Sequence, residues 1–392
     1  VSEARKQFPL KPDFMKIWYL DAKAFPADSS FAWVKATIEE SHAKGYKVAV
    51  HATQLKTAKL ALKAGANFLV HSVDDKIIDE EFIKLMLENK ATYIPTLLVY
   101  RNYIETFTET QQFSVADFNI AHPTPLGSYF DLKTINSEQL DYIQNSEVVL
   151  ERFKQNLHNT DSICAYNLAL LVKRGVNVAT GTDAGNIGTF HASSYYDELD
   201  AMSKFGLSNL EVLKASTING AMILNKDKEF GAIEVGKMAD LVILEENPIK
   251  NLNALKKIVY VIKNGQVHAV DSILSPSPEE LVQQQVNGYN ARNIDAFLAP
   301  YSDSLEIYMF PNTLQQEGKE NIKENYIQLF KNAPNLHCEI ISRTIHGNTV
   351  IDKERVRGIL DGKILEAVAI YEIENGKIAR VYFLKSIFLD ED

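Results

Sequence analysis

Three side chains that can bind a divalent metal ion stand at the ends of short apolar runs. His51 closes the run VAV, His71 closes FLV, and Asp183 closes VNVATGT. Imidazole nitrogen and carboxylate oxygen are ligands that zinc and similar ions accept. If these runs are parallel strands of a barrel, their carboxyl ends converge on one face, and ligands far apart in sequence can surround one ion. The pattern therefore predicts a metal site.

Lys16 is a fourth candidate ligand, in the earlier strand-like run MKIWYL. An ammonium group cannot bind a cation, so Lys16 could join the site only after carbamylation. Its other interpretation is a simple ion-pair partner. A lone histidine at a strand end is likewise more often a hydrogen-bonded structural residue. The predicted metal site therefore rests on the set of residues and not on any one of them.

The segments that carry these residues alternate between strand-like and helical patterns from residue 15 onward. Such alternation predicts a parallel sheet with helices between its strands, and so an α/β fold. Between residues 99 and 159 an aromatic and polar stretch breaks the rhythm, and we expect this long insertion to cover the mouth of the barrel. The expected helices cover residues 29–43, 55–63, 79–87 and 193–205.

Two β-rich blocks follow the last of these helices. FGAIEVGKMADLVIL and KKIVYVIKNGQVHAV predict a small antiparallel sheet over residues 230–271, with a hairpin turn at Asn264. The stretch SILSPSPEE suits neither a helix interior nor a central strand, so it marks a boundary. We therefore expect two domains. The first, 1–275, contains the barrel to about residue 225 and then small β-sandwich strands; the second, 278–392, is an α+β cone with a curved antiparallel sheet.

At these motifs the chain resembles the amidohydrolase superfamily, in the group that is similar to imidazolonepropionases and Xaa-Pro dipeptidases. DFMKIW resembles the segment of the strand-four lysine, VAVHATQ that of the strand-five histidine, AGANFLVHS that of the strand-six histidine, and TGTDAG that of the strand-eight aspartate. The resemblance spans roughly residues 12 to 270 and implies a TIM-type (β/α)8 metallohydrolase barrel.

This resemblance implies a role for each candidate residue. Lys16, His51, His71 and Asp183 would hold one or two divalent ions, zinc or a similar metal, as the cofactor. Asp183 would be the general base, and His71 or His191 would position the developing oxyanion of a small-molecule substrate. The implied reaction is hydrolysis of C–N bonds in a small cyclic amide or a peptide-like substrate.

The chain departs from the family pattern at one place. The family's first strand supplies a His-x-His pair, and no such pair occurs in this sequence. The first three strand-helix units are also absent, so the chain corresponds to an N-terminally truncated barrel without its closing seam. We therefore expect this fragment alone to be inactive and the hydrolytic function to belong to the parent protein.

Residues 278–392 resemble the SnoaL-like and steroid delta-isomerase-like family, whose helices and curved sheet enclose an apolar pocket. The resemblance is carried by VQQQVNGYNARNIDAFLAPYSDSLEIYMFP, by the helix at 318–330 and by GNTVIDKERVRG. A carboxylate in such a pocket can have a raised pKa and abstract a proton. Glu354 lies in the charged run DKERVR, for which we favour a solvated strand face. The candidate pocket residues are Tyr289, Asp303, His337 and Glu354.

Two alternatives to the hydrolase remain open. The C-terminal domain can bind or isomerise a small apolar molecule beside an inactive barrel fragment. It can also be a dimerisation module that forms a homodimer through its exposed sheet. Neither alternative requires the predicted metal site.

Composition and charge exclude other classes of partner. The 41 Lys and Arg against 51 Asp and Glu give a net charge of -10, which leaves no basic surface for nucleic acid. Cys164 and Cys338 lie far apart and indicate no disulfide framework. No apolar run approaches the ~18 residues that suggest a membrane-spanning helix. Cytoplasmic and exported locations both stay open.

Overall fold

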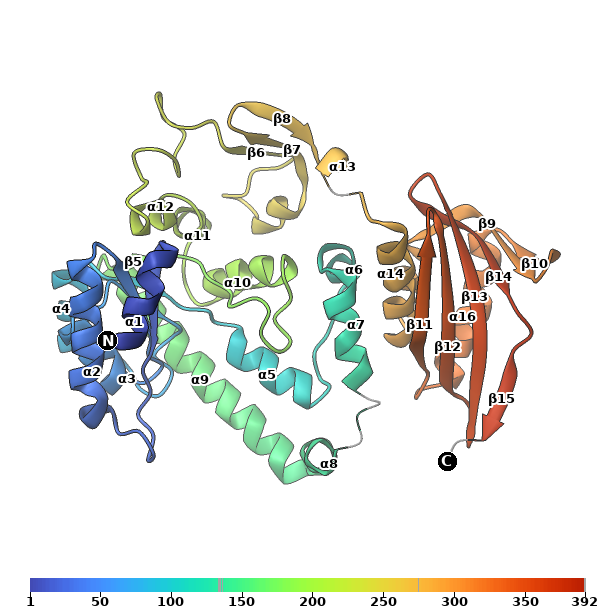
Figure 1. Cartoon of the computed structure of the whole chain (residues 1–392), viewed down its shortest axis with the longest axis horizontal. Helices are drawn as coiled ribbons and strands as arrows, with labels where there is room; N and C mark the ends of the chain where they lie inside the picture. Colours follow the sequence, from blue (N-terminus) through green and yellow to red (C-terminus); the bar gives the residue numbers. More distant parts are fainter. Residues whose placement is uncertain (133–134, 136, 274, 391–392) are drawn as a thin grey trace. The chain divides into compact units, whose positions relative to one another are not determined.

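The structure is a computed structural model that describes residues 1–132, 135, 137–273 and 275–390. By their internal contacts these residues form two units (Figure 1). The first unit contains Val1–Glu109, Tyr142–Thr189 and Ser194–Val270, and the second contains Thr110–Asp141, Phe190–Ser193 and Asp271–Asp392. The predicted domains are continuous stretches of chain, whereas the second unit also takes in two segments from the middle of the chain.

A parallel five-stranded sheet forms the centre of the first unit. Each strand pairs with its predecessor, so the order in the sheet is the order in the chain. This confirms the predicted α/β alternation and the parallel sheet; the eight-unit barrel stays a prediction. The strands are β1 (Phe14–Trp18), β2 (Lys47–His51), β3 (Phe68–Val70), β4 (Thr92–Ile94) and β5 (Asn177–Val178).

Helices connect these strands, because parallel neighbours need a crossover. The helices expected at 29–43, 55–63, 79–87 and 193–205 are all present. Among the described residues, no helix has the length and apolar character needed to cross a membrane. The helices of this part of the chain are α1 (Ser2–Gln7), η1 (Phe8–Leu10), α2 (Ala27–Ala43), α3 (Leu55–Lys63), α4 (Glu80–Glu88), α5 (Val99–Phe107), α8 (Glu138–Asn145), α9 (Glu147–Lys173), α10 (Ser193–Lys204), α11 (Asn209–Ala215) and α12 (Ile218–Ile223).

The two faces of the parallel sheet differ in what covers them. Val50 and Leu69 are fully buried in the main core of the first unit. Lys16 and Trp18 lie on the other face of β1 and are exposed, Trp18 by 73%. Successive residues of a strand point to opposite faces. The register of β1 and β2 therefore places Trp18 beside His51.

The segment between residues 99 and 159, expected to be a long loop-like insertion, is largely helical. Its middle forms α6 (Val115–Ile120) and α7 (Pro123–Asp131). Local signals begin both helices, because Ser114 and Asp117 form a capping box and a proline occupies the first turn of α7. The aromatic and polar composition of the segment obscures these caps, so the expectation of a loop was wrong.

A small antiparallel sheet ends the first unit, as predicted. Asn264 and Gly265 form the turn between its last two strands with φ of 50° and 80°, the left-handed values of a type I′ hairpin. The expectation of sandwich strands was wrong, because the described residues of this region form a single sheet. Its strands are β6 (Leu241–Leu244), β7 (Ile258–Lys263) and β8 (Gln266–Ala269), with η3 (Leu252–Lys256) between the first two and α13 (Val270–Ile273) after the last.

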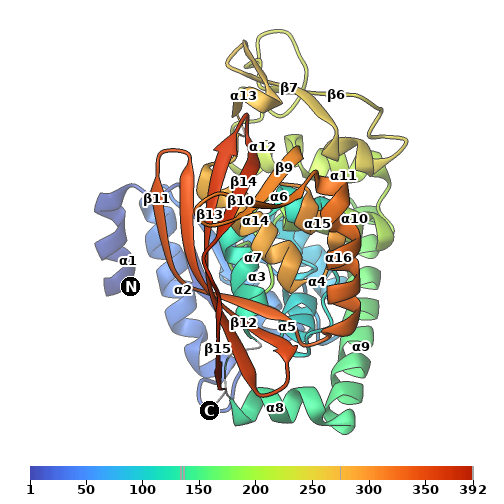
Figure 2. The same ribbon diagram turned by 90° about the vertical axis from the view of Figure 1, so that its right-hand side faces the viewer.

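The second unit packs helices against a curved mixed sheet (Figure 2). The sheet order is β10-β9-β14-β13-β12-β11, and β15 also pairs with β13. The predicted sheet was purely antiparallel, but β14 and β9 run parallel. The helices are α14 (Pro278–Asn290), α15 (Ile294–Leu298) and α16 (Lys319–Asn332); the strands are β9 (Tyr301–Met309), β10 (Thr313–Glu317), β11 (His337–His346), β12 (Thr349–Leu360), β13 (Lys363–Glu374), β14 (Lys377–Phe383) and β15 (Ile387–Asp390).

Helices α6 and α7 pack on α14 and α15 within the second unit (Figure 1). Phe118, Leu126 and Phe130 form an apolar cluster with Ala296 of α15. Asn287 of α14 is 1% exposed, and its Nδ2 donates to the carbonyl oxygen of Pro123 at 2.7 Å. The inserted helices are therefore part of the core of the second unit.

The Asn287 hydrogen bond gives a test of this packing. Asn287→Ala is expected to lower the free energy of unfolding of the second unit by about 1–3 kcal/mol, because it leaves the buried Pro123 carbonyl without its donor. Both tryptophans, Trp18 and Trp33, lie in the first unit. Amide hydrogen exchange in β12 and β13 therefore measures the second unit, and tryptophan fluorescence follows the first.

The matched control is Asn332→Ala, at an exposed position of α16. It should leave the exchange of β12 and β13 unchanged. An Asn287→Ala protein as stable as the Asn332→Ala control would contradict the packing of α7 on α14.

Candidate functional site

Two imidazole rings lie side by side at the carboxyl ends of neighbouring strands. His51 is the last residue of β2, and His71 directly follows β3. Their ring centroids are 4.4 Å apart with 62° between the planes, and Trp18 at the end of β1 lies 5.2 Å from His51. The backbone N–H of His71 donates to Ile94 of β4 at 2.9 Å. The parallel register of four strands thus sets the position of this pair.

The surroundings keep both imidazoles neutral at physiological pH. Burial lowers the pKa of His51 to about 4, with further lowering by His71 and by the charge of Lys16, while Asp183 acts in the opposite direction. Burial is also the main cause of the lowered pKa of His71. A hydrogen bond of 2.7 Å joins His71 Nδ1 to Thr96 Oγ1 and orients the ring. Neutral imidazole is the form that binds metal ions.

Asp183 and Lys16 lie within electrostatic range of both imidazoles. Asp183 follows β5, and its Oδ2 accepts a hydrogen bond from Asn186 Nδ2 at 2.9 Å. The Tyr103 hydroxyl donates to Asn186 in turn. The Lys16 side chain is exposed on β1. The structure therefore brings His51 and His71 into contact and places Asp183 and Lys16 within electrostatic range of that pair.

Three residues of this region adopt the left-handed backbone conformation that non-glycine residues rarely take. The φ angles are 74° at His71, 45° at Thr96 and 55° at Asp183. Such conformations cost about 1–3 kcal/mol each and cluster at functional sites. Their presence at the ends of three strands supports a shared functional role for this edge of the sheet.

The chemistry of the donor set decides whether these residues fit a divalent ion. Two neutral imidazoles and a nearby carboxylate are suitable ligands. Among the described residues, however, no three His, Cys, Asp or Glu side chains are arranged as a metal-binding group. The imidazole pair therefore fits an ion as two of its ligands, without completing a coordination shell.

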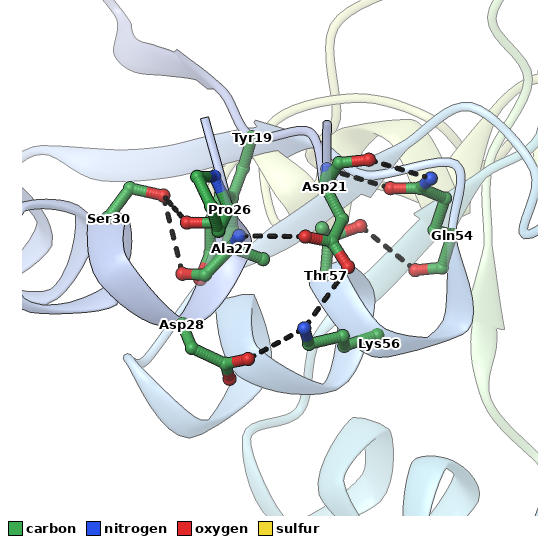
Figure 3. Close-up of polar contacts among 9 residues, drawn as sticks. All are labelled: Tyr19, Asp21, Pro26, Ala27, Asp28, Ser30, Gln54, Lys56 and Thr57. Carbon is green, nitrogen blue, oxygen red and sulfur yellow. Dashed lines mark hydrogen bonds and ion pairs between the residues drawn. The ribbon is translucent and has the colours of Figure 1, made fainter. Parts of the chain in front are cut away.

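The loop after β1 is tied to the loop after β2 by a polar network (Figure 3). Asp21 N–H donates to Gln54 Oε1 at 2.8 Å, and Asp21 Oδ1 accepts from the N–H of Ala27 at 2.8 Å. Lys56 Nζ contacts both Asp21 and Asp28, at 3.1 and 2.7 Å. The bonded residues lie in the segments just after Trp18 and His51. The network therefore fixes the ends of β1 and β2, which carry these two rings.

A cavity of about 170 Å³ adjoins His71. Asp74, three residues after His71, lies on its wall, and burial raises the pKa of this carboxyl to about 6. Neither Asp74 nor Thr96 was predicted from the sequence. For Asp74 the available signal was its place in the run HSVDD, close behind a predicted ligand. The remaining wall includes Thr96, Leu97, Val99, Tyr100 and Tyr103.

A second cavity, of about 260 Å³, lies inside the second unit. Tyr289 and Glu354 line it, as predicted for pocket residues. Asp303 does not, because its side chain is 93% exposed and pairs with Lys319 at 2.5 Å. His337 is buried but lies 3.4 Å from Asp131 and is not part of the cavity wall. The structure thus brings together two of the four candidates.

Glu354 was expected on a solvated strand face, and this expectation was wrong. Glu354 is buried, with only 6% of its surface exposed. Burial raises the pKa of its carboxyl to about 7, although a hydrogen bond of 2.8 Å from the Tyr371 hydroxyl acts in the opposite direction. Gln285 Nε2 donates to the same hydroxyl at 3.1 Å, and Tyr301 donates to Gln285 Oε1 at 3.2 Å. Sequence reasoning did not identify these three partners.

His191, the second candidate for positioning an oxyanion, has an exposed side chain. It lies in the short segment Phe190–Ser193, which belongs to the second unit. The ring of Phe190 in this segment is tilted by 58° against that of Phe113, with centroids 5.9 Å apart. The role of His191 stays a prediction.

Comparison with known proteins places this geometry in a family. The Amidohydrolase family matches residues 22–268, and the SnoaL-like domain matches residues 282–381. The 5-methylthioadenosine/S-adenosylhomocysteine deaminase of Thermoanaerobacter pseudethanolicus is 42% identical over 110 residues, 26% of either chain. Ochratoxinase of Aspergillus niger is 25% identical over 238 residues, 60% of this chain and 40% of that protein.

A crystal structure of a Xaa-Pro dipeptidase aligns with a TM-score of 0.47 at 23% identity, covering 68% of this chain and 56% of the other. The chain spans 26% and 40% of the lengths of the two curated relatives. The match of the family over more than half of the chain is decisive: this protein belongs to the amidohydrolase family and carries a SnoaL-like domain in its C-terminal part.

Proposed function

We propose that this chain carries part of the active site of a metal-dependent amidohydrolase that cleaves C–N bonds in a small cyclic amide or peptide-like substrate. The observation that supports the proposal is the pair of neutral imidazoles, His51 and His71, with Asp183 in electrostatic range. The parallel order of β1 to β5 supports it further, because the ligands in parallel (β/α) barrels stand at the carboxyl ends of strands.

His51, His71 and Asp183 are the residues that would hold a divalent ion, with Lys16 as a fourth ligand if it is carbamylated. Zinc or a similar ion, one or two per site, would supply Lewis acidity and lower the pKa of water. In the tautomer that donates from Nδ1–H to Thr96 Oγ1, Nε2 of His71 is the unprotonated ring nitrogen and would face a ligand.

Asp183 would act as the general base. Its carboxylate would take a proton from the attacking water as the oxygen bonds to the carbonyl carbon. The same proton would then pass to the nitrogen as the C–N bond breaks, so that an amine and a carboxylic acid leave. Asn186 orients the carboxylate through its 2.9 Å hydrogen bond. His71 or His191 would stabilise the charge that develops on the carbonyl oxygen.

Metal content tests this function most directly. The protein, expressed from its complete natural reading frame, is expected to bind near-stoichiometric zinc or a similar ion, and His51→Ala should reduce that amount. Plasma emission spectroscopy measures it. His346→Ala, at an exposed position of β11, is the control and should retain the metal. A wild-type protein that binds no ion after supplementation would contradict the hydrolase proposal.

A second candidate function belongs to the SnoaL-like domain. The buried Glu354, with a pKa of about 7 in an aromatic cavity, supports binding or isomerisation of a small apolar molecule. Such a molecule should slow hydrogen exchange in β12 and β13. Dimerisation through the sheet of this domain is a further proposal, which sedimentation velocity would test.

A further inference from the structure

The cavity beside His71 contains one acidic side chain, Asp74, that forms no ion pair with another described residue. The backbone of Asp74 is held by a hydrogen bond from its N–H to the carbonyl oxygen of Thr53 at 2.9 Å. Within the described part of the chain, no other residue donates a hydrogen bond to its carboxylate or forms an ion pair with it. Its neighbour Asp75 differs, because Oδ1 of Asp75 accepts from the N–H of Leu55 at 2.8 Å. Asp75 is thus a structural residue, and Asp74 is not.

The charge of Asp74 acts on the walls of this cavity. Burial raises the pKa of Tyr100, and the carboxylate of Asp74 raises it further. The same charge adds to the effect of burial on Cys164. Among the residues that the structure describes, neither lysine nor arginine lines the cavity. A partly buried carboxylate without an ion-pair partner costs free energy, which a cation or an N–H donor entering the cavity would recover.

The size of the cavity limits what can enter. About 170 Å³ is close to the roughly 150 Å³ of an engineered protein cavity that admits benzene. The space therefore accepts one ring or a short chain and not a whole drug-sized molecule. Leu97, Val99 and Tyr100 supply an apolar and aromatic wall, and an aromatic face also attracts a cation.

We propose that this cavity is the specificity pocket of the hydrolytic site and that Asp74 binds a protonated amine on the amide substrate. The apolar body of that substrate group lies against Leu97, Val99 and Tyr100, and its scissile amide lies at His71. This inference rests on the proposed function for the reaction itself, but the binding of the amine requires only the cavity. The cavity would therefore select substrates that carry a basic group on one side of the amide.

Binding of two small probes to the full chain tests the proposal without any catalysis. Tyramine and 4-ethylphenol share the ring and the two-carbon chain and differ in the terminal amine. At pH 7.5, where Asp74 is ionised, tyramine is expected to bind at least about tenfold more tightly than 4-ethylphenol in isothermal titration calorimetry. Asp74→Asn should remove this preference, because the amide keeps the shape and loses the charge.

Two control variants locate the effect. Asp75→Asn should keep the preference, since an asparagine oxygen can still accept from Leu55. Glu354→Gln should also keep it, because that carboxyl lies in the cavity of the second unit. A preference lost in Glu354→Gln but retained in Asp74→Asn would overturn the proposal. Equal affinities for the two probes in the wild-type chain would overturn it too, even where Asp74→Asn fails to fold.

The outcome is separate from that of the hydrolase proposal. A chain without metal or hydrolytic activity that still prefers tyramine through Asp74 supports the pocket and contradicts only the reaction. A chain that binds metal and hydrolyses amides but shows no amine preference contradicts only the pocket.

Discussion

Asp183→Asn is expected to lower kcat for amide hydrolysis by about 10²–10⁴-fold, with little change in KM. The amide cannot take the proton from water that we assign to the Asp183 carboxylate. Asparagine is also a substitution that this position tolerates, because the φ of 55° is a left-handed value that asparagine adopts more readily than most residues. The loss of rate should therefore occur without a loss of folding.

Steady-state kinetics across a panel of small amides measures this effect, with the best wild-type substrate used for the variant. Asp13→Asn, at an exposed position before β1, is the matched control and should retain the wild-type rate. A variant at position 183 with a normal kcat would exclude Asp183 as the general base, whatever the metal content of the protein.

Glu354 is expected to make the second unit less stable as the pH rises. Its pKa is raised by burial from 4.5 to about 7, so the folded state holds a proton that the unfolded state has already released between these values. The stability from this group is present below about pH 4.5 and is lost as the pH rises through 7. A shift of this size corresponds to about 3 kcal/mol.

Glu354→Gln should remove this dependence, because glutamine does not titrate. Urea unfolding of the wild-type and variant proteins is monitored by hydrogen exchange in β12 and β13 at pH 5 and pH 8. It gives the change in the free energy of unfolding with pH for each protein. Asp303→Asn provides the control, since this carboxylate is exposed on β9. Identical pH slopes in the wild-type and Glu354→Gln proteins would show that Glu354 is ionised in the folded state at both pH values.

The inserted helices α6 and α7 belong to one part of the protein by sequence and to the other by packing. They lie within the stretch that matches the amidohydrolase family, residues 22–268, yet they share a core with the SnoaL-like domain. Phe190, which follows the loop of Asp183, contacts Phe113 in the same unit. Removing the C-terminal domain would therefore expose the apolar sides of α6 and α7.

The sequence by itself determined the elements of the first unit and the residues of its candidate site. Strand and helix periodicity is local, so β1 to β5 and the connecting helices could be predicted from short windows. His51, His71 and Asp183 stand where parallel strands end, and any parallel sheet brings such ends to one edge. The turn at Asn264 was equally local, because its left-handed backbone depends on only two residues.

Glu354 shows how far a local pattern reaches. Val350, Asp352, Glu354 and Val356 occupy alternate positions along β12, and all four are buried. This alternation was visible in the sequence, but it does not say what neutralises the buried carboxylates. Arg343 of β11 pairs with Asp352 at 2.6 Å, and Tyr371 of β13 donates to Glu354. Those partners come from other strands.

Only the tertiary structure decided which distant groups meet. Asn287 and Pro123 are 164 residues apart, and no pattern in either segment indicates the other. Asp303 was predicted for a cavity and is exposed, whereas Asp74 lies on a cavity wall that its own segment does not specify. Periodicity assigns a residue to a face of its element, but the partner of that face depends on how whole elements pack. Burial, and with it the pKa of each carboxyl, follows from that packing.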